Sequence, residues 1–369
     1  MTDRPITVVV PGDPNQRTGG YLYDAHMVTA MKQAGWTVEV VGLKGAFPDV
    51  DETAIDAMTQ ALMSAPANAC VILDGLAMSG FGDRLVEVRK SVRHHHHHHH
   101  KQRQHWVGLV HHPLADEQGL SIEQQTALKQ KETSALSACD AVLVTSAFTA
   151  QRLVDQGYLE HAPEVVIPGV EPAPLADIAQ HPKAISEGIR LLTVASLTPR
   201  KGHDVLLHAL ATLKDFDWVC RWVGDAHRDP SHADKLQGLV KELNLEERIE
   251  WFGEADEAQL AESYHQAHLS ILPSHYEGYG MVVTESLARG VPVITTDGGA
   301  LRDTLPQGAG LQVSAGAAEP LAQALRKWLV EPELQTALLA GAYNARVELK
   351  NWANQGQRFI EALGLDTLD

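Results

Sequence analysis

The chain has 369 residues, a length that points to two domains of ordinary size. It contains 47 acidic and 30 basic residues, and the net charge of −17 argues against a nucleic-acid partner held by a broad basic surface. Hydrophobic residues make up 44% of the chain, which is enough for a full core and too many for disorder. The apolar run at residues 6–10 is too short for a signal peptide or a membrane span.

Cysteine usage bears on the compartment. The chain has 3 cysteines, Cys70, Cys139 and Cys220, which lie far apart and form no C-x-x-C pair. This pattern favours unpaired thiols in a reducing compartment, so we expect a cytoplasmic protein.

Short apolar segments rich in β-branched residues alternate with longer segments of helical spacing. Such segments are typical of strands buried on both faces of a parallel sheet and joined by crossover helices. The first series of expected strands is 6–10, 37–41, 69–73, 106–110, 141–145 and 165–167. The second series is 191–195, 218–223, 249–252, 268–272 and 291–295. Each series has the length of one doubly wound α/β domain.

A proline-rich stretch separates the two series. Pro168, Pro172, Pro174 and Pro182 resist both helix and central strand, which predicts a linker over residues 167–188. We therefore expect one Rossmann-like domain over residues 1–170 and a second over residues 185–349.

Two segments in the first half of the chain have a strongly biased composition. A basic cluster indicates either a peripheral membrane contact or, the interpretation we favour, a solvated loop. Its members are Arg84, Arg89, Lys90, Arg93, Lys101 and Arg103. The run of histidines from His94 to His100 resembles either an internal purification tag or a low-complexity insertion. A homopolymer does not supply the fixed geometry of a dedicated metal site.

The first loop with candidate chemistry covers residues 11–20 and ends in Gly19 and Gly20, before a predicted helix. Glycines at a helix start leave backbone N–H groups open to an anion or a sugar hydroxyl, although ordinary turn glycines are the alternative. The loop matches neither the Walker motif nor the dinucleotide fingerprint.

The second loop, residues 198–206, directly follows a predicted strand. Its cations suit a diphosphate at the carboxyl edge of a parallel sheet, with Lys201 as a point charge and Arg200 as a fork. Two solvated charges on a loop are the alternative interpretation.

The third segment, residues 273–294, is the most informative. Glu277 stands in a glycine-rich loop, and Glu285 falls eight positions later in a helix predicted to begin near Gly280. Gly278 and Gly280 allow close backbone approach, and the helix N-terminus suits a phosphate. The two carboxylates can accept hydrogen bonds from hydroxyls, so the segment suggests a nucleotide joined to a sugar. Helix-dipole preference alone would also explain Glu285.

This segment resembles the E-x7-E signature of the retaining family 4 glycosyltransferases. Residues 198–206 resemble the family's K-G-x-D-x-L segment, residues 223–225 its V-G-D turn, residues 168–170 its interdomain I-P-x-G-V, and residues 18–20 its G-G loop. The resemblance covers essentially the whole chain in the right order. It implies a GT-B fold, in which two Rossmann-like domains face each other across a cleft and a last helix, about residues 350–369, packs back on the first domain.

The resemblance also implies an activity. A hexosyl group would move, with retention of configuration, from a nucleoside-diphosphate sugar on the C-terminal domain to a hydroxyl acceptor on the N-terminal domain. The acceptor would be a glycan, a lipid-linked sugar or a small molecule, and no cofactor or metal ion would be required. The implied catalytic residues are Glu277, Lys201 and His111. His112 is the neighbouring alternative to His111, and a structural turn at a strand end is the other interpretation of this pair.

The donor-binding positions implied by the resemblance are Gly19, Gly20, Ser196, Arg200, Lys201, Glu277, Gly278, Tyr279, Gly280 and Glu285. One position departs from the family pattern. Ser196 stands where the family has an arginine that grips the diphosphate, and Arg200 is the candidate replacement.

Two routes to retention fit the sequence equally well: a covalent intermediate on a carboxylate, or a front-face route in which the leaving phosphate deprotonates the acceptor. A catalytically silent binding or scaffold subunit is the main competing function. Ser196 supports it, whereas Glu277 and Glu285 argue against it. A nicotinamide-dependent dehydrogenase is disfavoured because G-x-G-x-x-G is absent.

Overall fold

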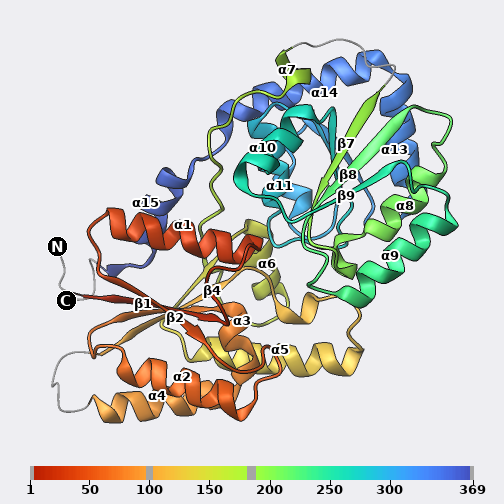
Figure 1. The fold of residues 1–369 in the computed structure, drawn as a ribbon. Helices are drawn as coiled ribbons and strands as arrows, with labels where there is room; N and C mark the ends of the chain where they lie inside the picture. Colours follow the sequence, from red (N-terminus) through yellow and green to blue (C-terminus); the bar gives the residue numbers. More distant parts are fainter. Residues whose placement is uncertain (1–3, 97–102, 181–187, 366–369) are drawn as a thin grey trace. The chain divides into compact units, whose positions relative to one another are not determined.

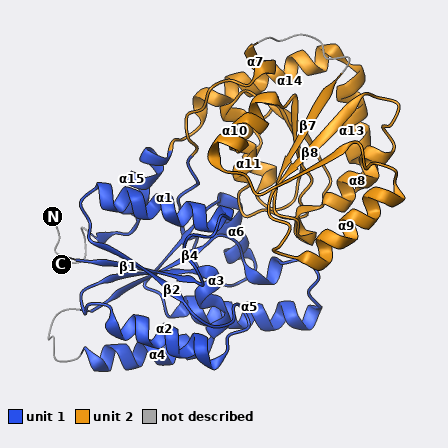
Figure 2. Cartoon of the chain, viewed as in Figure 1, with its two compact units in different colours: residues 1–169, 352–369 blue, residues 170–351 orange. Residues whose placement is uncertain are grey.

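The computed structural model describes residues 4–96, 103–180 and 188–365. Residues Met1–Gly169 and Trp352–Asp369 form one compact unit, unit 1, and Val170–Asn351 form another, unit 2 (Figure 2). Three features of the sequence analysis lie outside the described residues: histidines 97–100, Lys101 and Pro182. The first histidines of the run, His94 and His95, extend the end of a helix.

Unit 1 is built on one parallel sheet with the order β2-β1-β3-β4-β5-β6. Its strands are β1 (Ile6–Pro11), β2 (Val38–Leu43), β3 (Cys70–Asp74), β4 (His105–Val110), β5 (Ala141–Val144) and β6 (Glu164–Val165). Its helices are α1 (Gly19–Gln33), α2 (Glu52–Ser64), α3 (Gly75–Met78), α4 (Asp83–His95), α5 (Ile122–Ser137), α6 (Ala147–Asp155) and α15 (Trp352–Ala362). In Figure 1, α1 lies over one face of the sheet and α2 and α4 over the other. Every residue of β1 and β3 is therefore buried, which explains their unbroken apolar runs.

The last helix, α15, completes unit 1 by packing against α1 (Figure 1). The Trp352 ring stacks on the His26 ring with centroids 3.9 Å apart. Phe359 is buried with its ring 6.2 Å from that of Tyr23, in an edge-on arrangement. Aromatic contacts of this kind stabilise the pairing of two helices that are far apart in the sequence.

Unit 2 is a second parallel sheet, with the order β12-β11-β10-β7-β8-β9. Its strands are β7 (Ile189–Val194), β8 (Trp218–Val223), β9 (Ile249–Gly253), β10 (Leu269–Leu272), β11 (Val293–Thr296) and β12 (Gly310–Val313). Its helices are α7 (Asp177–Gln180), α8 (His203–Ala211), α9 (Pro230–Glu242), α10 (Glu257–Gln266), α11 (Met281–Ala288), α12 (Leu301–Thr304), α13 (Ala318–Val330) and α14 (Pro332–Ala345). Strand β12 is not among the predicted strands, because this short edge strand begins with glycine and is only partly buried.

Part of the expected linker belongs to unit 2. Residues 177–180 form α7, and Ala176 and Ile178 are buried in a cluster with Tyr264 and Leu339. The prolines do prevent regular structure before residue 177, but they do not prevent the apolar residues that follow them from packing on a core.

The structure changes the interpretation of the basic cluster. Arg89 is buried, with its Nη2 2.5 Å from Asp140 Oδ2 and its guanidinium 5.1 Å from the centre of the Trp106 ring. A side chain enclosed in this way cannot face a membrane, so Arg89 is wrongly placed in a surface patch. None of the helices in the described part of the chain has both the length and the apolar character to cross a bilayer.

Candidate active site

The charged loops of unit 2 meet at one place on its sheet. The strand order reverses beside β7, which has β8 on one side and β10 on the other. Ligand sites of open parallel sheets lie at the carboxyl ends of the strands beside such a reversal. The loop after β7 carries Arg200 and Lys201, and the loop after β10 carries Glu277. The two loops are joined directly, because the His275 backbone N–H donates a 2.8 Å hydrogen bond to the Arg200 carbonyl.

Glu277 is the centre of this cluster. Lys201 Nζ lies 2.5 Å from Glu277 Oε1, and Arg200 Nη1 lies 3.1 Å from Glu277 Oε2. The Glu277 side chain is 9% exposed. Burial by itself would raise the pKa of Glu277, but Lys201 and Arg200 outweigh it and lower this pKa to about 2. Glu277 is therefore ionised at neutral pH, and its carboxylate forms ion pairs with both cations.

The position of Glu277 is fixed by several contacts of its own loop. Ser274 Oγ donates a 2.7 Å hydrogen bond to the same carboxylate oxygen that Lys201 contacts. The Glu277 carbonyl accepts a 2.9 Å hydrogen bond from the Ala300 N–H, and Glu277 forms a parallel bridge with Gly299. Glu277 is thus held in place through both its backbone and its carboxylate.

The helix that follows, α11, begins at a left-handed residue. Gly280 is its N-cap with φ of 94°, and a Cβ there would lie 2.5 Å from Leu301 Cδ2. Only glycine meets both conditions without strain, which explains the second glycine of the motif. The predicted start of the helix is confirmed, and its N-terminal N–H groups follow directly after the Glu277 loop.

Glu285 lies on α11 and has a buried partner that the sequence analysis missed. Tyr264 Oη donates a 2.9 Å hydrogen bond to Glu285 Oε2, and Tyr264 itself is fully buried. Arg289 lies with its guanidinium carbon 4.5 Å from the centre of the Tyr264 ring and donates to the Glu285 carbonyl. Burial raises the pKa of Glu285, while the Tyr264 hydrogen bond and the charge of Arg289 oppose that rise. Tyr264 lies on α10, so no local motif could have indicated it.

The remaining expected donor residues of unit 2 lie on the same two loops. Ser196 follows β7, and its carbonyl accepts a 2.9 Å hydrogen bond from the Thr198 N–H. Gly278 and Tyr279 lie between Glu277 and Gly280, and the Tyr279 carbonyl accepts a 2.6 Å hydrogen bond from Thr304 Oγ1. Burial raises the pKa of the Tyr279 hydroxyl to about 12, so this hydroxyl stays protonated at neutral pH.

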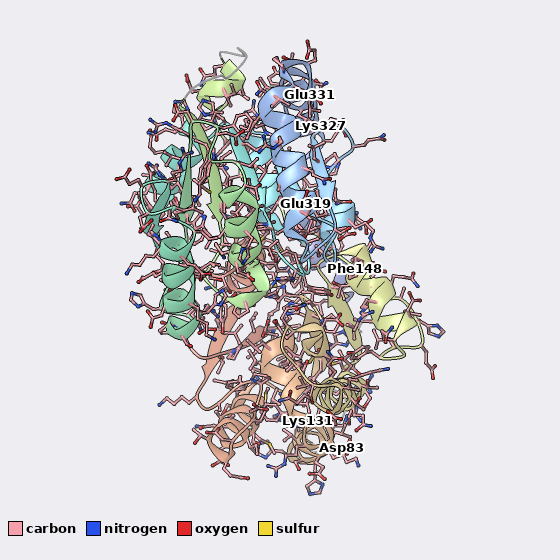
Figure 3. All side chains as sticks on the ribbon, turned by 90° about the vertical axis from the view of Figure 1, so that its right-hand side faces the viewer. Asp83, Lys131, Phe148, Glu319, Lys327 and Glu331 are labelled. Carbon is pink, nitrogen blue, oxygen red and sulfur yellow. The ribbon has the colours of Figure 1, made fainter. Side chains whose placement is uncertain are left out.

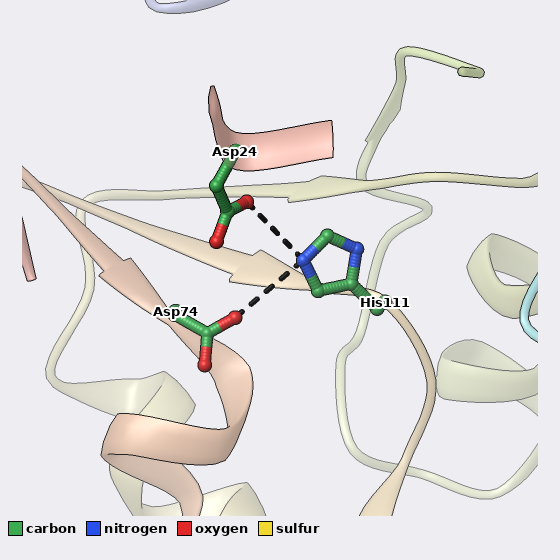
Figure 4. Close-up of side chains that lie close together, drawn as sticks. All are labelled: Asp24, Asp74 and His111. Carbon is green, nitrogen blue, oxygen red and sulfur yellow. Dashed lines mark ion pairs between the residues drawn. The ribbon is translucent and has the colours of Figure 1, made fainter. Parts of the chain in front are cut away.

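Unit 1 contains a second cluster, also where the strand order reverses. The strand order changes at β1, which has β2 on one side and β3 on the other. Gly19 and Gly20 open the helix after β1, and His111 follows β4. His111 Nε2 lies 3.3 Å from Asp24 Oδ1 and 3.5 Å from Asp74 Oδ2 (Figure 4). A Cβ at Gly20 would lie only 3.2 Å from His111 Cδ2, so glycine allows α1 to approach the ring.

The charges around His111 favour its protonated form. Burial by itself would lower the pKa of His111, but the contacts with Asp24 and Asp74 raise it to about 10. The donor atoms of these three residues lie within 4.8 Å of one another, a spacing that a metal ion also requires. The 3.3 Å and 3.5 Å separations and the raised pKa describe an ion pair, and the expectation that no metal is needed stays a prediction.

The neighbouring His112 has a different partner. Its Nε2 lies 2.7 Å from Glu117 Oε1, in the loop that follows β4. The contacts with Asp24 and Asp74 therefore distinguish His111 from its neighbour as the candidate catalytic histidine at the end of β4.

Sequence reasoning did not identify Asp24 or Asp74. A signal for Asp74 was present, because it ends a fully buried strand at the carboxyl edge where sites gather. Asp24 carried a weaker signal, as an acid on the buried side of the helix that follows Gly19 and Gly20.

Comparison with known proteins finds a family match for the C-terminal part of the chain. Residues 177–345, most of unit 2, match the family described as Glycosyl transferases group 1. This part of the chain belongs to that family, which confirms the resemblance there. A D-inositol 3-phosphate glycosyltransferase from Kineococcus radiotolerans is 28% identical over 256 residues, covering 62% of this chain and 58% of the relative. A mannosylfructose-phosphate synthase from Agrobacterium fabrum is 28% identical over 187 residues, covering 47% of this chain and 41% of the relative. The matched part thus spans less than two thirds of these relatives' length.

Solved structures show the fold. The sucrose-phosphate synthase from Thermosynechococcus elongatus superposes with a TM-score of 0.77 at 22% identity, covering 97% of this chain and 98% of that chain. Anabaena HepE in complex with UDP and glucose superposes with a TM-score of 0.74 at 16% identity, covering 98% and 99%. The predicted GT-B class, with two Rossmann-like α/β units, is confirmed.

Proposed function

We propose that this glycosyl transferases group 1 protein moves a hexosyl group from a nucleoside-diphosphate sugar to a hydroxyl acceptor, with retention and without a metal ion. The observation that carries the proposal is the gathering of Lys201, Arg200 and Glu277 where the strand order of unit 2 reverses. The HepE structures hold UDP and UDP-glucose, which supports a nucleotide sugar as the class of donor.

The cations act on the leaving group. When the bond between the anomeric carbon and the diphosphate breaks, negative charge develops on the departing phosphate oxygens. Lys201 and Arg200, together with the N-terminus of α11, stabilise that charge. Glu277 holds both cations at one place and offers its oxygens to the hydroxyls of the transferred sugar.

Arg200 takes the part of the arginine that the family pattern would place at Ser196. Its Nη1 reaches both Glu277 Oε2, at 3.1 Å, and the Tyr276 carbonyl, at 2.8 Å. The guanidinium is thereby fixed beside Lys201, so this site has two cations despite Ser196.

The nucleoside end of the donor binds at Glu285. Its carboxylate accepts hydrogen bonds from the ribose hydroxyls, and the buried Tyr264 hydroxyl orients it. This arrangement separates the two glutamates by role, Glu277 toward the sugar and Glu285 toward the ribose.

The names of two relatives support a class of acceptor. D-inositol 3-phosphate glycosyltransferase and mannosylfructose-phosphate synthase are both named for phosphorylated polyol or sugar compounds. Phosphorylated polyols and sugars are therefore the first acceptors to test, with unit 1 as the acceptor-binding domain.

The test starts with the donor. Calorimetry with UDP, GDP and ADP should show one nucleotide that binds, and the corresponding sugar nucleotides should be hydrolysed slowly in the absence of an acceptor. Glu277→Gln should abolish this hydrolysis while leaving the protein folded. With an acceptor, proton NMR should show a product with the anomeric configuration of the donor. Absence of nucleotide binding, or binding without any sugar transfer or hydrolysis, would instead support the silent scaffold subunit.

A further inference from the structure

The two ring nitrogens of His111 have different surroundings. Nε2 is buried and points between two carboxylates, at 3.3 Å from Asp24 and 3.5 Å from Asp74. Figure 4 shows the other nitrogen, Nδ1, on the side of the ring away from both carboxylates. The His111 side chain is 20% exposed, so the ring is enclosed on one edge and accessible on part of its surface.

Both carboxylates are held in place by their own elements. Asp74 Oδ1 accepts a 3.2 Å hydrogen bond from the Ala77 N–H, which leaves Oδ2 directed at the ring. Asp24 lies on α1 and is buried, and its Oδ1 has no hydrogen bond elsewhere among the described residues. The backbone of His111 is tied as well, because Thr145 Oγ1 donates to its carbonyl at 3.3 Å.

The charges around the ring favour a protonated imidazole. Among the described residues, the titratable side chains that face His111 are Asp24 and Tyr23 from α1 and Asp74 from the end of β3. The Tyr23 hydroxyl donates to the Val166 carbonyl at 2.9 Å, and the pKa of Tyr23 is raised by burial, so it stays neutral. A proton on the imidazole between these two buried carboxylates offsets the cost of burying their negative charges.

We propose that Asp24 and Asp74 are positioning residues that keep His111 in its imidazolium form, with Nε2–H turned inward between them and Nδ1–H turned outward as a fixed hydrogen-bond donor to a substrate oxygen. This inference rests on the proposed glycosyl transfer. A neutral ring with its proton on Nε2 would instead present Nδ1 as an acceptor and would select a hydroxyl hydrogen. Asp24 and Asp74 thus determine which kind of group His111 binds. The imidazolium binds a hydrogen-bond acceptor, namely an oxygen lone pair or a phosphate oxygen, and not a hydrogen-bond donor.

The protonation state can be measured without any substrate. Nitrogen-15 NMR of histidine-labelled protein, with the His111 signals assigned by difference from His111→Gln, should show both ring nitrogens protonated up to about pH 9. Asp24→Asn and Asp74→Asn should each lower the pKa of His111 by roughly 1 to 3 units, because each removes one opposite charge within 4 Å. An unprotonated Nε2 at pH 7 in the unaltered protein, whether the ring is neutral or bound to a metal ion, would overturn the proposal.

The pH dependence of transfer supplies the functional test. The unaltered protein should keep its rate up to about pH 9, whereas Asp24→Asn and Asp74→Asn should lose roughly twofold to 100-fold at pH 9, for a fall of 1 to 3 units in the pKa of His111, and recover at pH 6.5. The exposed Asp56→Asn on α2 is the matched control and should follow the unaltered protein. A uniform loss at every pH would show a merely structural role and would contradict the inference. If the NMR result holds but no sugar is transferred by the unaltered protein, the proposed function fails and the protonation of His111 stands.

Discussion

Lys201 donates to Glu277 across 76 positions of the sequence, and the two side chains meet with Nζ 2.5 Å from Oε1. Both are largely buried, with 17% of the Lys201 side chain and 9% of the Glu277 side chain exposed. A charge pair in these surroundings is screened less by solvent than a surface pair. Glu277 therefore presents Lys201 at the carboxyl edge of unit 2 as a cation of defined position, which is what a leaving diphosphate requires.

Lys201→Ala should lower turnover by about 10²–10³ while the protein stays folded, since one preorganised donor to the developing charge has typically that effect. Lys327→Ala is the matched control, because Lys327 is exposed on α13 (Figure 3). Steady-state kinetics with the donor identified by calorimetry would measure both variants. Unchanged turnover in Lys201→Ala would remove Lys201 from the mechanism.

Glu277 should make the stability of unit 2 sensitive to acid. Its pKa is lowered from 4.5 to about 2 in the folded protein, so its contribution is fully present above pH 4.5 and is lost as the pH falls toward 2. Between pH 6 and pH 3, the free energy of unfolding should fall by about 2 kcal/mol more in the unaltered protein than in Glu277→Gln. Urea unfolding at several pH values measures this difference. Parallel curves would contradict it, and the exposed Glu246→Gln should behave like the unaltered protein.

Tyr264→Phe should weaken nucleotide binding roughly tenfold to 150-fold, because removing a hydrogen bond to a carboxylate costs on the order of 1.5 to 3 kcal/mol. The hydroxyl donates to Glu285 Oε2 at 2.9 Å, and the ring itself would stay in place. Tyr343→Phe, on an exposed tyrosine of α14, provides the same chemical change away from the site. Calorimetry with the nucleoside diphosphate that binds measures the affinity of both variants. Equal affinities would show that the Tyr264 hydroxyl has no part in binding the ribose.

Arg89→Ala should destabilise unit 1 by about 3–5 kcal/mol, because it leaves the Asp140 carboxylate without its closest cation. The exposed neighbour Lys90→Ala should change stability by less than about 0.5 kcal/mol. Thermal or urea unfolding distinguishes the two variants. Equal and small effects would show that the pair with Asp140 contributes nothing to the stability of unit 1.

The central strands could be predicted because a parallel sheet buries both of its faces, so such a strand appears as an unbroken apolar run, as in β1 and β3. The edge strand β12 escaped prediction because an edge is half solvated and its residues carry no such run. Arg89 was misplaced for a related reason. The other described basic residues of its cluster are exposed, while its ion-pair partner, Asp140, lies 51 positions away in the sequence.

By itself, the sequence determined the paired α/β architecture, the glycine-opened helix α11 and the loops that bear Lys201, Glu277 and His111, because each of these is encoded in a short stretch of chain. Only the tertiary structure decided the partners: Ser274 and the two cations at Glu277, Tyr264 at Glu285, and the acid pair at His111. The reason is physical. Periodicity and turn chemistry act over a few residues, whereas burial and charge pairing act between side chains that chain topology brings together from distant positions.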